Sequence, residues 1–409
     1  MNDPDPSLPV VISGGGPAGM MCGYLLARAG IPVTVLEKHP DFLRDFRGDT
    51  IHPSTLEVMA DLGLLEEFLE RPHQKVRHAE GEIGDTRIRI ADLTHLPTRC
   101  KFMVFMPQWD FLDFLAEKAR GFPTFQLRMN TESVRLLREG DRVTGVEVES
   151  REAGREQLKA RLLIVAEGRD SKLREEAGLP RKSFGAPMDV LWFRLKFREG
   201  DSMAVLGRIA HGQLLVMLYR GDYWQCAHII RKGSFDQVRK EGLEAFRRKV
   251  AALARRGSAE EIRSWDDVKL LTVVVDRLER WTLPGALFIG DASHAMSPVG
   301  GVGINLAIQD AVAAANLLAG ELRRGTPARA MLDRVQRRRE FPTRVTQAMQ
   351  VWLQNHAIDP ILRSGRTPAV PGILRLAQRF PWLQRIPARV IGIGFRPERV
   401  RTPAVPSGS

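Results

Sequence analysis

The sequence predicts an α/β protein in which an open parallel sheet is divided along the chain by an antiparallel sheet. A buried strand, a glycine turn, a helix and a second strand follow one another within residues 9–37, which is a compact βαβ unit. Apolar and polar residues alternate in short runs between residues 188 and 232, as in antiparallel strands. A strand of parallel type returns at residues 286–289, ahead of a glycine-rich loop and a long helix. The first domain is therefore discontinuous, and the inserted sheet forms a second domain.

Each expected element rests on a local pattern of apolar, capping and turn residues. In the first half of the chain we expect strands at 9–13, 31–37 and 162–166, helices at 20–29, 53–69 (with Ser54 as N-cap) and 110–120, and a hairpin over 134–149. In the second half we expect the antiparallel strands, a strand at 286–289 and a helix over 304–321. The first domain then comprises residues 1–75, 100–180 and 280–340, the second 76–99 and 181–279, and a basic helical C-terminal segment 341–409.

The composition of the 409 residues is that of a folded globular protein, with 44% hydrophobic and 27% charged residues. The three cysteines, Cys22, Cys100 and Cys226, are far apart and form no metal-binding pattern, so we expect neither disulfides nor a metal site. The N-terminus is acidic and leads directly into a strand, unlike a signal peptide. No apolar run approaches the roughly 20 residues of a membrane-spanning helix, so the sequence predicts a cytoplasmic protein.

The formal net charge of +12 is concentrated near the C-terminus. From Ile361 onward nine arginines stand against a single acid, Glu398, and apolar residues that include Phe380 and Trp382 lie between them. Such a basic amphipathic segment would suit peripheral contact with an anionic membrane surface. It also fits a helix that packs on the body of the protein and exposes a basic face. No nucleic-acid-recognition motif accompanies the charge, so nucleic acid is not an expected partner.

The turn after the first strand carries a phosphate-binding pattern, formed by Gly14, Gly15, Gly16, Pro17, Ala18 and Gly19. Gly14 permits a tight turn, Gly16 lets backbone N–H groups approach a pyrophosphate, and Gly19 lets helix and strand pack closely. The start of the helix adds partial positive charge. Glu37, followed by Lys38, ends the second strand, where a carboxylate accepts hydrogen bonds from an adenosine ribose. Because an acid disfavours a 2′-phosphate here, the sequence predicts FAD or NAD, and not NADP, at this turn.

A second glycine-rich segment, GDASHAMSPVGGVGINLAIQDA, begins at Gly290. A strand brings Asp291 to its carboxyl end, the edge at which an open parallel sheet binds ligands. Pro298 and Gly301 would keep side chains away from a large flat ligand, and a helix then starts at Gly303, Ile304 and Asn305. The free N–H groups and the dipole of this helix would stabilise negative charge on a reduced isoalloxazine ring, while Asp291 suits ribityl hydroxyls.

These two segments resemble those of the class A flavin monooxygenases, the aromatic hydroxylases of the para-hydroxybenzoate hydroxylase type, and especially their ubiquinone-biosynthesis-like branch. The likeness extends over residues 1–340. It implies a Rossmann-type, GR2-like FAD-binding domain with an inserted substrate-binding sheet. It also implies contacts with FAD by Arg47, by Gln108 and by the backbone of Val134.

One segment departs from the family pattern. Where the family has GADGRxSxVR, this chain reads VAEGRDSKLR, with Glu167 in the place of the aspartate. The charge is kept on a longer side chain, so we expect the turn after the strand to survive. The choice between NADH and NADPH stays open.

The resemblance implies a tightly but non-covalently bound FAD, with NADH or NADPH and O2 as transient co-substrates. Reduced FAD would react with O2 to give a flavin hydroperoxide, which hydroxylates or epoxidises an electron-rich ring or double bond. Because this chemistry centres on the flavin, no catalytic side chain is predicted. No Ser/His/Asp triad is found in the sequence, and His294 is expected to shape the loop after Asp291.

The inserted sheet is the expected substrate wall. Candidates for substrate contacts are His211, Gln213, Met217, Tyr219 and Trp224. Gln213, Met217 and Tyr219 share one strand face by their period of two, and this face either lines the pocket or packs in the core. The apolar character of the region favours a small lipophilic substrate that is aromatic, quinone-like or quinolone-like. The sequence indicates no particular oligomeric state.

Three other functions share parts of this pattern. A flavin-dependent halogenase would need a WxWxIP-like stretch and a specific catalytic lysine. We find neither feature in the sequence. A flavin-dependent reductase or oxidase of a lipophilic substrate would use the same glycine turns. A non-catalytic binding scaffold with a flavoprotein fold would differ in failing to take up FAD.

Overall fold

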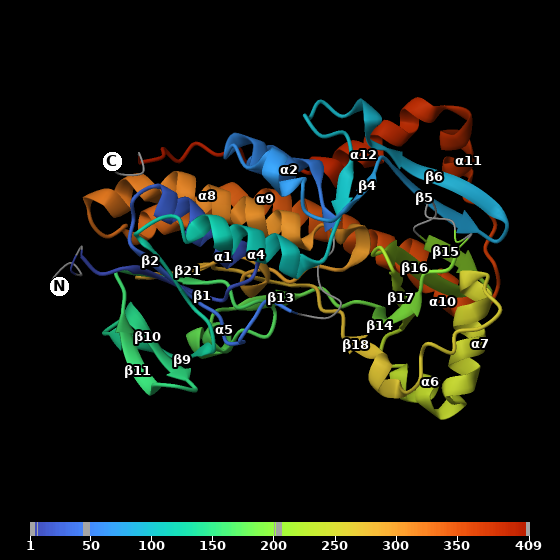
Figure 1. Ribbon diagram of the computed structural model, residues 1–409, viewed down its shortest axis with the longest axis horizontal. Helices are drawn as coiled ribbons and strands as arrows, with labels where there is room; N and C mark the ends of the chain where they lie inside the picture. Colours follow the sequence, from blue (N-terminus) through green and yellow to red (C-terminus); the bar gives the residue numbers. More distant parts are fainter. Residues whose placement is uncertain (1–4, 6, 44–49, 200, 202–206, 406–409) are drawn as a thin grey trace.

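The computed structural model describes residues 5, 7–43, 50–199, 201 and 207–405 of the chain. A mainly parallel sheet under long helices lies at one end of the molecule, and an antiparallel sheet lies at the other (Figure 1). The long helices α8 (Gly303–Arg324) and α9 (Arg329–Leu353) cover the parallel sheet. This arrangement confirms the α/β fold with an inserted antiparallel sheet.

The parallel sheet has six strands in the order β20–β21–β12–β1–β2–β8, and all neighbours except β20 and β21 are parallel. The strands are β20 (Thr282–Leu283), β21 (Ala286–Phe288), β12 (Leu162–Val165), β1 (Val10–Ser13), β2 (Val33–Leu36) and β8 (Phe125–Arg128). Ile12 lies in the core beneath α1 (Pro17–Arg28), α4 (Gln108–Ala119) and α8. Val11 lies in the opposite core beneath β9 (Thr131–Glu139), β10 (Arg142–Ser150) and β11 (Gly154–Lys159). Because both faces are covered, β1, β2 and β12 are buried along their whole length and consist mainly of apolar residues.

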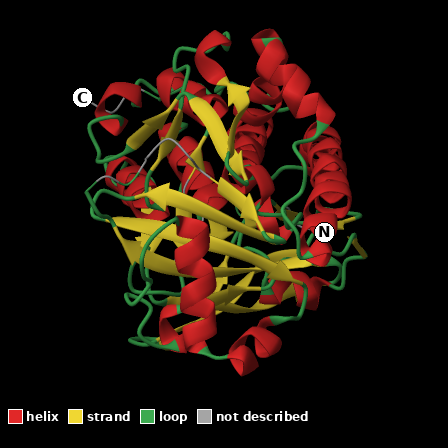
Figure 2. Cartoon of the chain, turned by 90° about the vertical axis from the view of Figure 1, so that its right-hand side faces the viewer, coloured by secondary structure: helices red, strands yellow, loops and turns green. Residues whose placement is uncertain are grey.

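The antiparallel lobe is built on a seven-stranded sheet in the order β18–β14–β17–β16–β15–β5–β6. The strands are β18 (Lys269–Leu271), β14 (Met188–Lys196), β17 (Tyr223–Arg231), β16 (Gln213–Tyr219), β15 (Gly207–Ala210), β5 (His78–Ile83) and β6 (Thr86–Asp92). Helices α6 (Phe235–Glu241) and α7 (Leu243–Ala254) lie on its outer side (Figure 2). The sheet thus joins two segments that are far apart in the sequence, β5–β6 and β14–β18.

Several smaller elements connect the two lobes. Strands β3 (Thr50–Ile51), β7 (Met103–Phe105) and β4 (Gln74–Val76) form one small sheet, and β13 (Arg181–Ser183) pairs with β19 (Asp276–Leu278). Helix α5 (Lys172–Ala177) follows β12. After α9 come α10 (Asp359–Ser364), which lies beside β16 and β17, and then α11 (Gly372–Arg379) and α12 (Arg385–Gly392), which lie at the top of the molecule in Figure 1.

Some expected element boundaries are wrong. Helix α1 begins at Pro17 and not at Met20, because proline at the first helical position sacrifices no hydrogen bond. The helix expected over residues 53–69 is two helices, α2 (Pro53–Asp61) and α3 (Leu65–Phe68), separated by Gly63 with a φ of 72°. Its N-cap is His52, and Ser54 is instead a buried residue inside the first turn.

The expectation that no apolar run reaches spanning length needs correction. The stretch Val299–Arg324, which contains α8, is long and apolar enough to cross a membrane by length and composition. However, 83% of its apolar window is buried inside the protein, where α8 packs against α1 and α9. Its apolar composition is therefore explained by its place in the core.

Candidate active site

A cavity of about 620 Å³ lies between the carboxyl ends of the parallel strands and the inner face of the antiparallel sheet. Its nucleotide half is lined by the ends of β1, β2 and β12, by the start of β9 and by the loop between β21 and α8. Its sheet half is lined by side chains of β14, β16, β17 and β18. The two glycine-rich segments, which are far apart in the sequence, thus meet at one cavity.

The first glycine turn has the geometry of a phosphate cradle. Gly14 has a φ of 108°, and a Cβ added there would lie 2.4 Å from the carbonyl oxygen of Ala166. A Cβ at Gly19 would lie 1.9 Å from the carbonyl oxygen of Gly14, so helix and turn touch through backbone atoms. Gly16 has no neighbour within 4 Å of such a Cβ and lines the cavity directly before α1. The open side of this turn therefore suits a pyrophosphate at a helix start.

The carboxylate at the end of β2 also lies on the cavity wall. Glu37 Oε2 accepts a hydrogen bond from the backbone N–H of Gly15 (3.1 Å), and Oε1 accepts one from that of His39 (3.1 Å). Lys38 lines the cavity beside it. These bonds fix the carboxylate next to the glycine turn, as a ribose-binding residue requires.

The second glycine segment forms the facing wall. Asp291 lies in the turn after β21, and its Oδ2 is 3.5 Å from Arg169. The wall continues through Pro298, Gly301, Gly303 and Ile304 to the start of α8. A Cβ at Gly301, whose φ is 63°, would lie 3.1 Å from Thr50 Oγ1. The loop therefore lines the cavity with several glycines and leads into a helix start, which suits a planar ring.

Asn305 lies at the start of α8, as expected, and its side chain has a separate role. Its side chain does not line the cavity but lies buried beneath the loop. Its Oδ1 accepts hydrogen bonds from the His52 backbone N–H (2.9 Å) and Thr55 Oγ1 (2.7 Å), and its Nδ2 donates to the Thr50 carbonyl (3.3 Å). The Asn305 side chain thus fastens α8 to β3 and α2, and only its backbone belongs to the helix start.

The three residues for which the resemblance implies a contact with FAD do not all line the cavity. Gln108, the first residue of α4, lines the cavity. Val134 does not line it, but the preceding residues of β9, Thr131, Glu132 and Ser133, do. Arg47 lies outside the described residues. Because β9 enters the site with its first residues, the adenosine end of a nucleotide would meet Thr131–Ser133.

Glu167, the departure from the family pattern, is a cavity-wall residue in a closed hydrogen-bond network. The Ser13 and Ser171 hydroxyls each donate to it over 2.6 Å, and the Leu173 backbone N–H donates over 3.2 Å. Burial raises the pKa of this carboxyl above its ordinary value, although these three donors oppose the rise. The longer side chain reaches back to β1, so it fastens the turn after β12 as expected.

The sequence reasoning missed part of the nucleotide half, namely Thr131, Glu132, Ser133, Arg169, Asp170 and Lys172. All six lie at the start of β9 or directly after β12. The signal that could have found them is the rule that open parallel sheets bind ligands beyond the carboxyl ends of their strands.

The predicted substrate contacts lie on the wrong side of the sheet. His211, Gln213, Met217, Tyr219 and Trp224 do not line the cavity. Met217 and Trp224 pack in the core beneath α7, Tyr219 packs against that core, and His211 lies in the exposed turn before β16. The cavity wall is instead formed by the alternate residues, Leu214, Val216 and Leu218, with Met188, Val190, Trp192, Ala227, Ile229 and Leu271. Because β16 is apolar on both faces, its period of two did not identify the face that α7 covers.

The geometry fits FAD. One glycine turn and helix start suit its pyrophosphate, Glu37 suits its adenosine ribose, and Asp291 with the glycine-rich loop before α8 suits its ribityl chain and ring. The apolar sheet wall lines the same cavity as these FAD-binding elements.

Comparisons with known proteins agree with this geometry. The sequence profile of the FAD binding domain family matches residues 7–349. A 6-methylpretetramide 4-monooxygenase of Streptomyces rimosus is 30% identical over 400 residues, covering 96% of this chain and 94% of its own length. A rifampicin monooxygenase of Streptomyces venezuelae is 27% identical over 308 residues, with 74% and 62% covered.

The fold is likewise shared with solved structures. An anhydrotetracycline hydroxylase of Streptomyces rimosus superimposes with a TM-score of 0.73 at 24% identity, over 94% of this chain and 75% of the other. The chain therefore belongs to the FAD binding domain family, as a flavin-dependent monooxygenase of the class A aromatic hydroxylases.

Proposed function

We propose that this monooxygenase hydroxylates a lipophilic, fused-ring aromatic substrate bound against the β14–β16–β17 wall of the cavity. The wall itself carries the proposal, because none of its described side chains is charged: Met188, Val190, Trp192, Leu214, Val216, Leu218, Ala227, Ile229 and Leu271. Two similar proteins are named for polycyclic compounds, 6-methylpretetramide and anhydrotetracycline, which supports a substrate of that class.

The residues of the protein bind FAD and the substrate, orient the substrate, and exclude water. Bound FAD, once reduced by NAD(P)H, supplies the activation of O2 for insertion of one oxygen atom. We assign FAD binding to the glycine turn, Glu37 and Asp291. The titratable side chains described on the wall all lie in the nucleotide half: Glu37, Lys38, His39, Glu132, Glu167, Arg169, Asp170, Lys172 and Asp291. The site of oxygen insertion would thus depend on how the apolar wall orients the rings and keeps water out.

Turnover of a substrate panel tests the proposal. The holoenzyme would receive NADH or NADPH, isotopically labelled O2 and aromatic compounds of increasing ring number. We expect fused-ring phenols to accelerate NAD(P)H oxidation and to gain one labelled oxygen atom, detected by mass spectrometry. A single-ring carboxylate such as para-hydroxybenzoate is the control, because its charge has no partner on the described wall. Preference for that carboxylate, or hydrogen peroxide as the sole product with every compound, would refute the proposal.

We further propose that the C-terminal segment makes peripheral contact with an anionic membrane. Helices α11 and α12 and the short connection between them expose Ile373 (75%) and Trp382 (58%), together with Leu376, Phe380 and Ile386. Exposed arginines lie among them, at positions 375, 379, 385 and 389. Between residues 360 and 397 the sequence has no acid, so the same surface of a second copy would be repelled. An anionic lipid surface would complement both the charge and the apolar groups.

Vesicle flotation tests this contact. We expect the holoenzyme to float with vesicles of phosphatidylglycerol and phosphatidylcholine, but not with phosphatidylcholine alone. Trp382→Ser and Arg379→Gln should each weaken the binding, with Arg379→Gln costing about 1 kcal/mol. Equal binding to both kinds of vesicle, or to neither, would refute an electrostatic membrane contact.

A further inference from the structure

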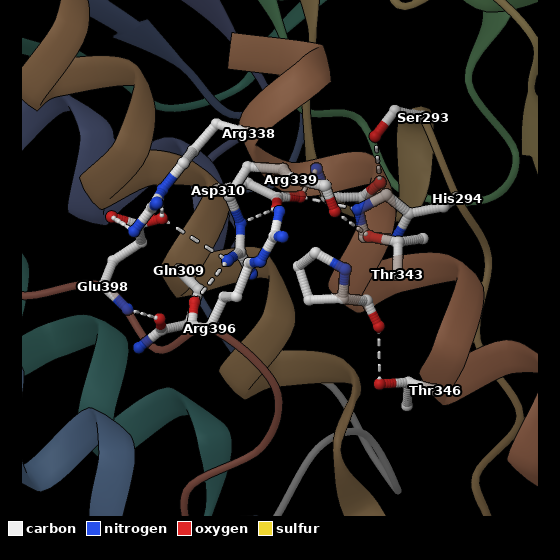
Figure 3. Close-up of polar contacts among 12 residues, drawn as sticks. Ser293, His294, Gln309, Asp310, Arg338, Arg339, Thr343, Thr346, Arg396 and Glu398 are labelled. Carbon is white, nitrogen blue, oxygen red and sulfur yellow. Dashed lines mark hydrogen bonds and ion pairs between the residues drawn. The ribbon is translucent and has the colours of Figure 1, made fainter.

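A buried carboxylate on α8, Asp310, joins parts of the chain outside the cavity wall. Its side chain is 0% exposed. Its Oδ2 accepts hydrogen bonds from the Gly290 backbone N–H (3.1 Å) and from His294 Nε2 (2.6 Å), and its Oδ1 accepts one from Arg339 Nε (3.0 Å) (Figure 3). Both oxygens are therefore occupied by donors from other segments.

Two of these donors hold the turn that carries Asp291. Gly290 directly precedes Asp291, and His294 follows it at the end of the same turn. Gly290 has a φ of 61°, and a Cβ there would lie 3.0 Å from that of Ala18, so the turn is pressed against α1. Asp310 thus holds the backbone before Asp291 and the His294 side chain after it, although Asp310 itself does not line the cavity.

The third donor, Arg339, connects Asp310 to the C-terminal segment. It is 1% exposed, donates from Nη1 to the Arg396 carbonyl (3.3 Å) and lies 3.6 Å from Glu398 Oε1. Glu398 is also bound by Arg338 Nε (2.6 Å), and its backbone N–H donates to Gln309 (Figure 3). Residues 396–398 therefore close a network that begins at the Asp291 turn.

The charges of the network depend on one another. Burial opposes ionisation of Asp310, but His294 and Arg339 outweigh it and hold the pKa of this carboxyl below its ordinary value. A buried charge is stable only with its partners in place. Loss of one member would therefore disturb the others.

We propose that Asp310 and His294 are positioning residues for Asp291, and that Arg339 and Glu398 hold Asp310 in place, so that FAD affinity depends on a contact with the C-terminal segment. The inference rests on the role proposed above for Asp291. It assigns to residues 396–398 a part in cofactor retention although they lie outside the cavity lining.

The test measures the Kd for FAD from the fluorescence of flavin released when holoenzyme is diluted. We expect Asp310→Asn to raise this Kd about tenfold, since it removes one charge-assisted set of hydrogen bonds. Glu398→Gln should raise the Kd by a smaller factor. This variant provides the test if Asp310→Asn does not fold. The double variant Asp291→Ala/Asp310→Asn should bind FAD no more weakly than Asp291→Ala, because positioning has no effect once its target is gone.

A matched control uses the neighbouring anchor of the same segment. Arg399 is bound by Asp61 and Glu57, neither of which contacts the Asp291 turn. Asp61→Asn should therefore leave the Kd unchanged. An equal rise in Asp61→Asn and Glu398→Gln would overturn the role of residues 396–398, and a full additional loss in the double variant would overturn positioning through Asp291. Weak FAD binding by Asp291→Ala with normal binding by Asp310→Asn would refute this inference alone. Normal binding by Asp291→Ala would refute the role of Asp291 as well.

Discussion

The two halves of the cavity differ in the extent to which backbone atoms or side chains form their walls. In the nucleotide half, glycines of the Gly14–Gly16 turn and of the loop before α8 line the cavity with backbone atoms, next to polar side chains such as Glu37 and Asp291. In the sheet half, the wall consists of side chains from alternate residues of strands such as β16. A wall made of backbone requires glycine at fixed positions, whereas a wall made of side chains accepts many apolar residues.

This difference has a consequence for substitutions. A side chain added in the nucleotide half should exclude the cofactor. The protein around Gly16 nevertheless has room for such a side chain, so the fold should be kept. In the sheet half, the effect of a substitution should depend on which of two adjacent residues is changed. The difference between the two halves therefore predicts that cofactor binding, stability and substrate binding are each weakened by a different substitution.

The largest effect is expected at Gly16. Its φ of −74° suits any residue, and an added Cβ has no protein neighbour within 4 Å. Gly16→Val should therefore fold normally yet weaken FAD binding at least about a thousandfold, or about 4 kcal/mol, because the side chain occupies the pyrophosphate position. Flavin content after purification and circular dichroism would measure both. Gly320→Ala on the exposed side of α8 is the control, and full flavin occupancy in Gly16→Val would contradict the cradle.

A smaller effect should separate the two faces of β16. Leu215 is 0% exposed in the core beneath α7, whereas Val216 lines the cavity. Leu215→Ala should lower the free energy of unfolding by about 2–5 kcal/mol and leave KM unchanged. Val216→Phe should raise KM for the substrate and keep stability within about 1–3 kcal/mol. Denaturant unfolding measures the stability and steady-state kinetics measures KM. If the cavity lay on the other face of β16, Leu215→Ala would change KM and Val216→Phe would lower the stability.

The smallest effect concerns His228, beside Phe246 in the outer core. Burial, with a minor contribution from Lys249, lowers the pKa of His228 to about 4. The unfolded chain takes up a proton below about pH 6.5 and the folded chain does not, so stability is full above that pH and falls as pH decreases toward 4. His228→Leu should remove about 1–2 kcal/mol of the stability difference between pH 7 and pH 5. Urea unfolding at both pH values measures it, with His356→Gln as the control that should change nothing.

The same contrast explains what the sequence could predict. The glycine turns, Glu37 and Asp291 were found because a phosphate and a flat ring tolerate few alternatives at those positions. The sequence left open which face of β16 forms the substrate wall, because Leu214 and Leu215 are equally apolar and only the packing of α7 decides between the two faces. The role proposed for Asp310 could not be predicted either, since its partners come from the Asp291 turn and from α9.

The pairing of β1 with β12, and of β12 with β21, brings Val10 beside Leu162 and Leu163 beside Ala286. On the ribosome, β12 must therefore remain without its neighbour β21 until strands β14–β18 of the antiparallel lobe have been made. Contacts of such long sequence separation form slowly. Until β21 has emerged, exposed strand edges would invite aggregation, so this protein should gain yield from slow translation or from added chaperones.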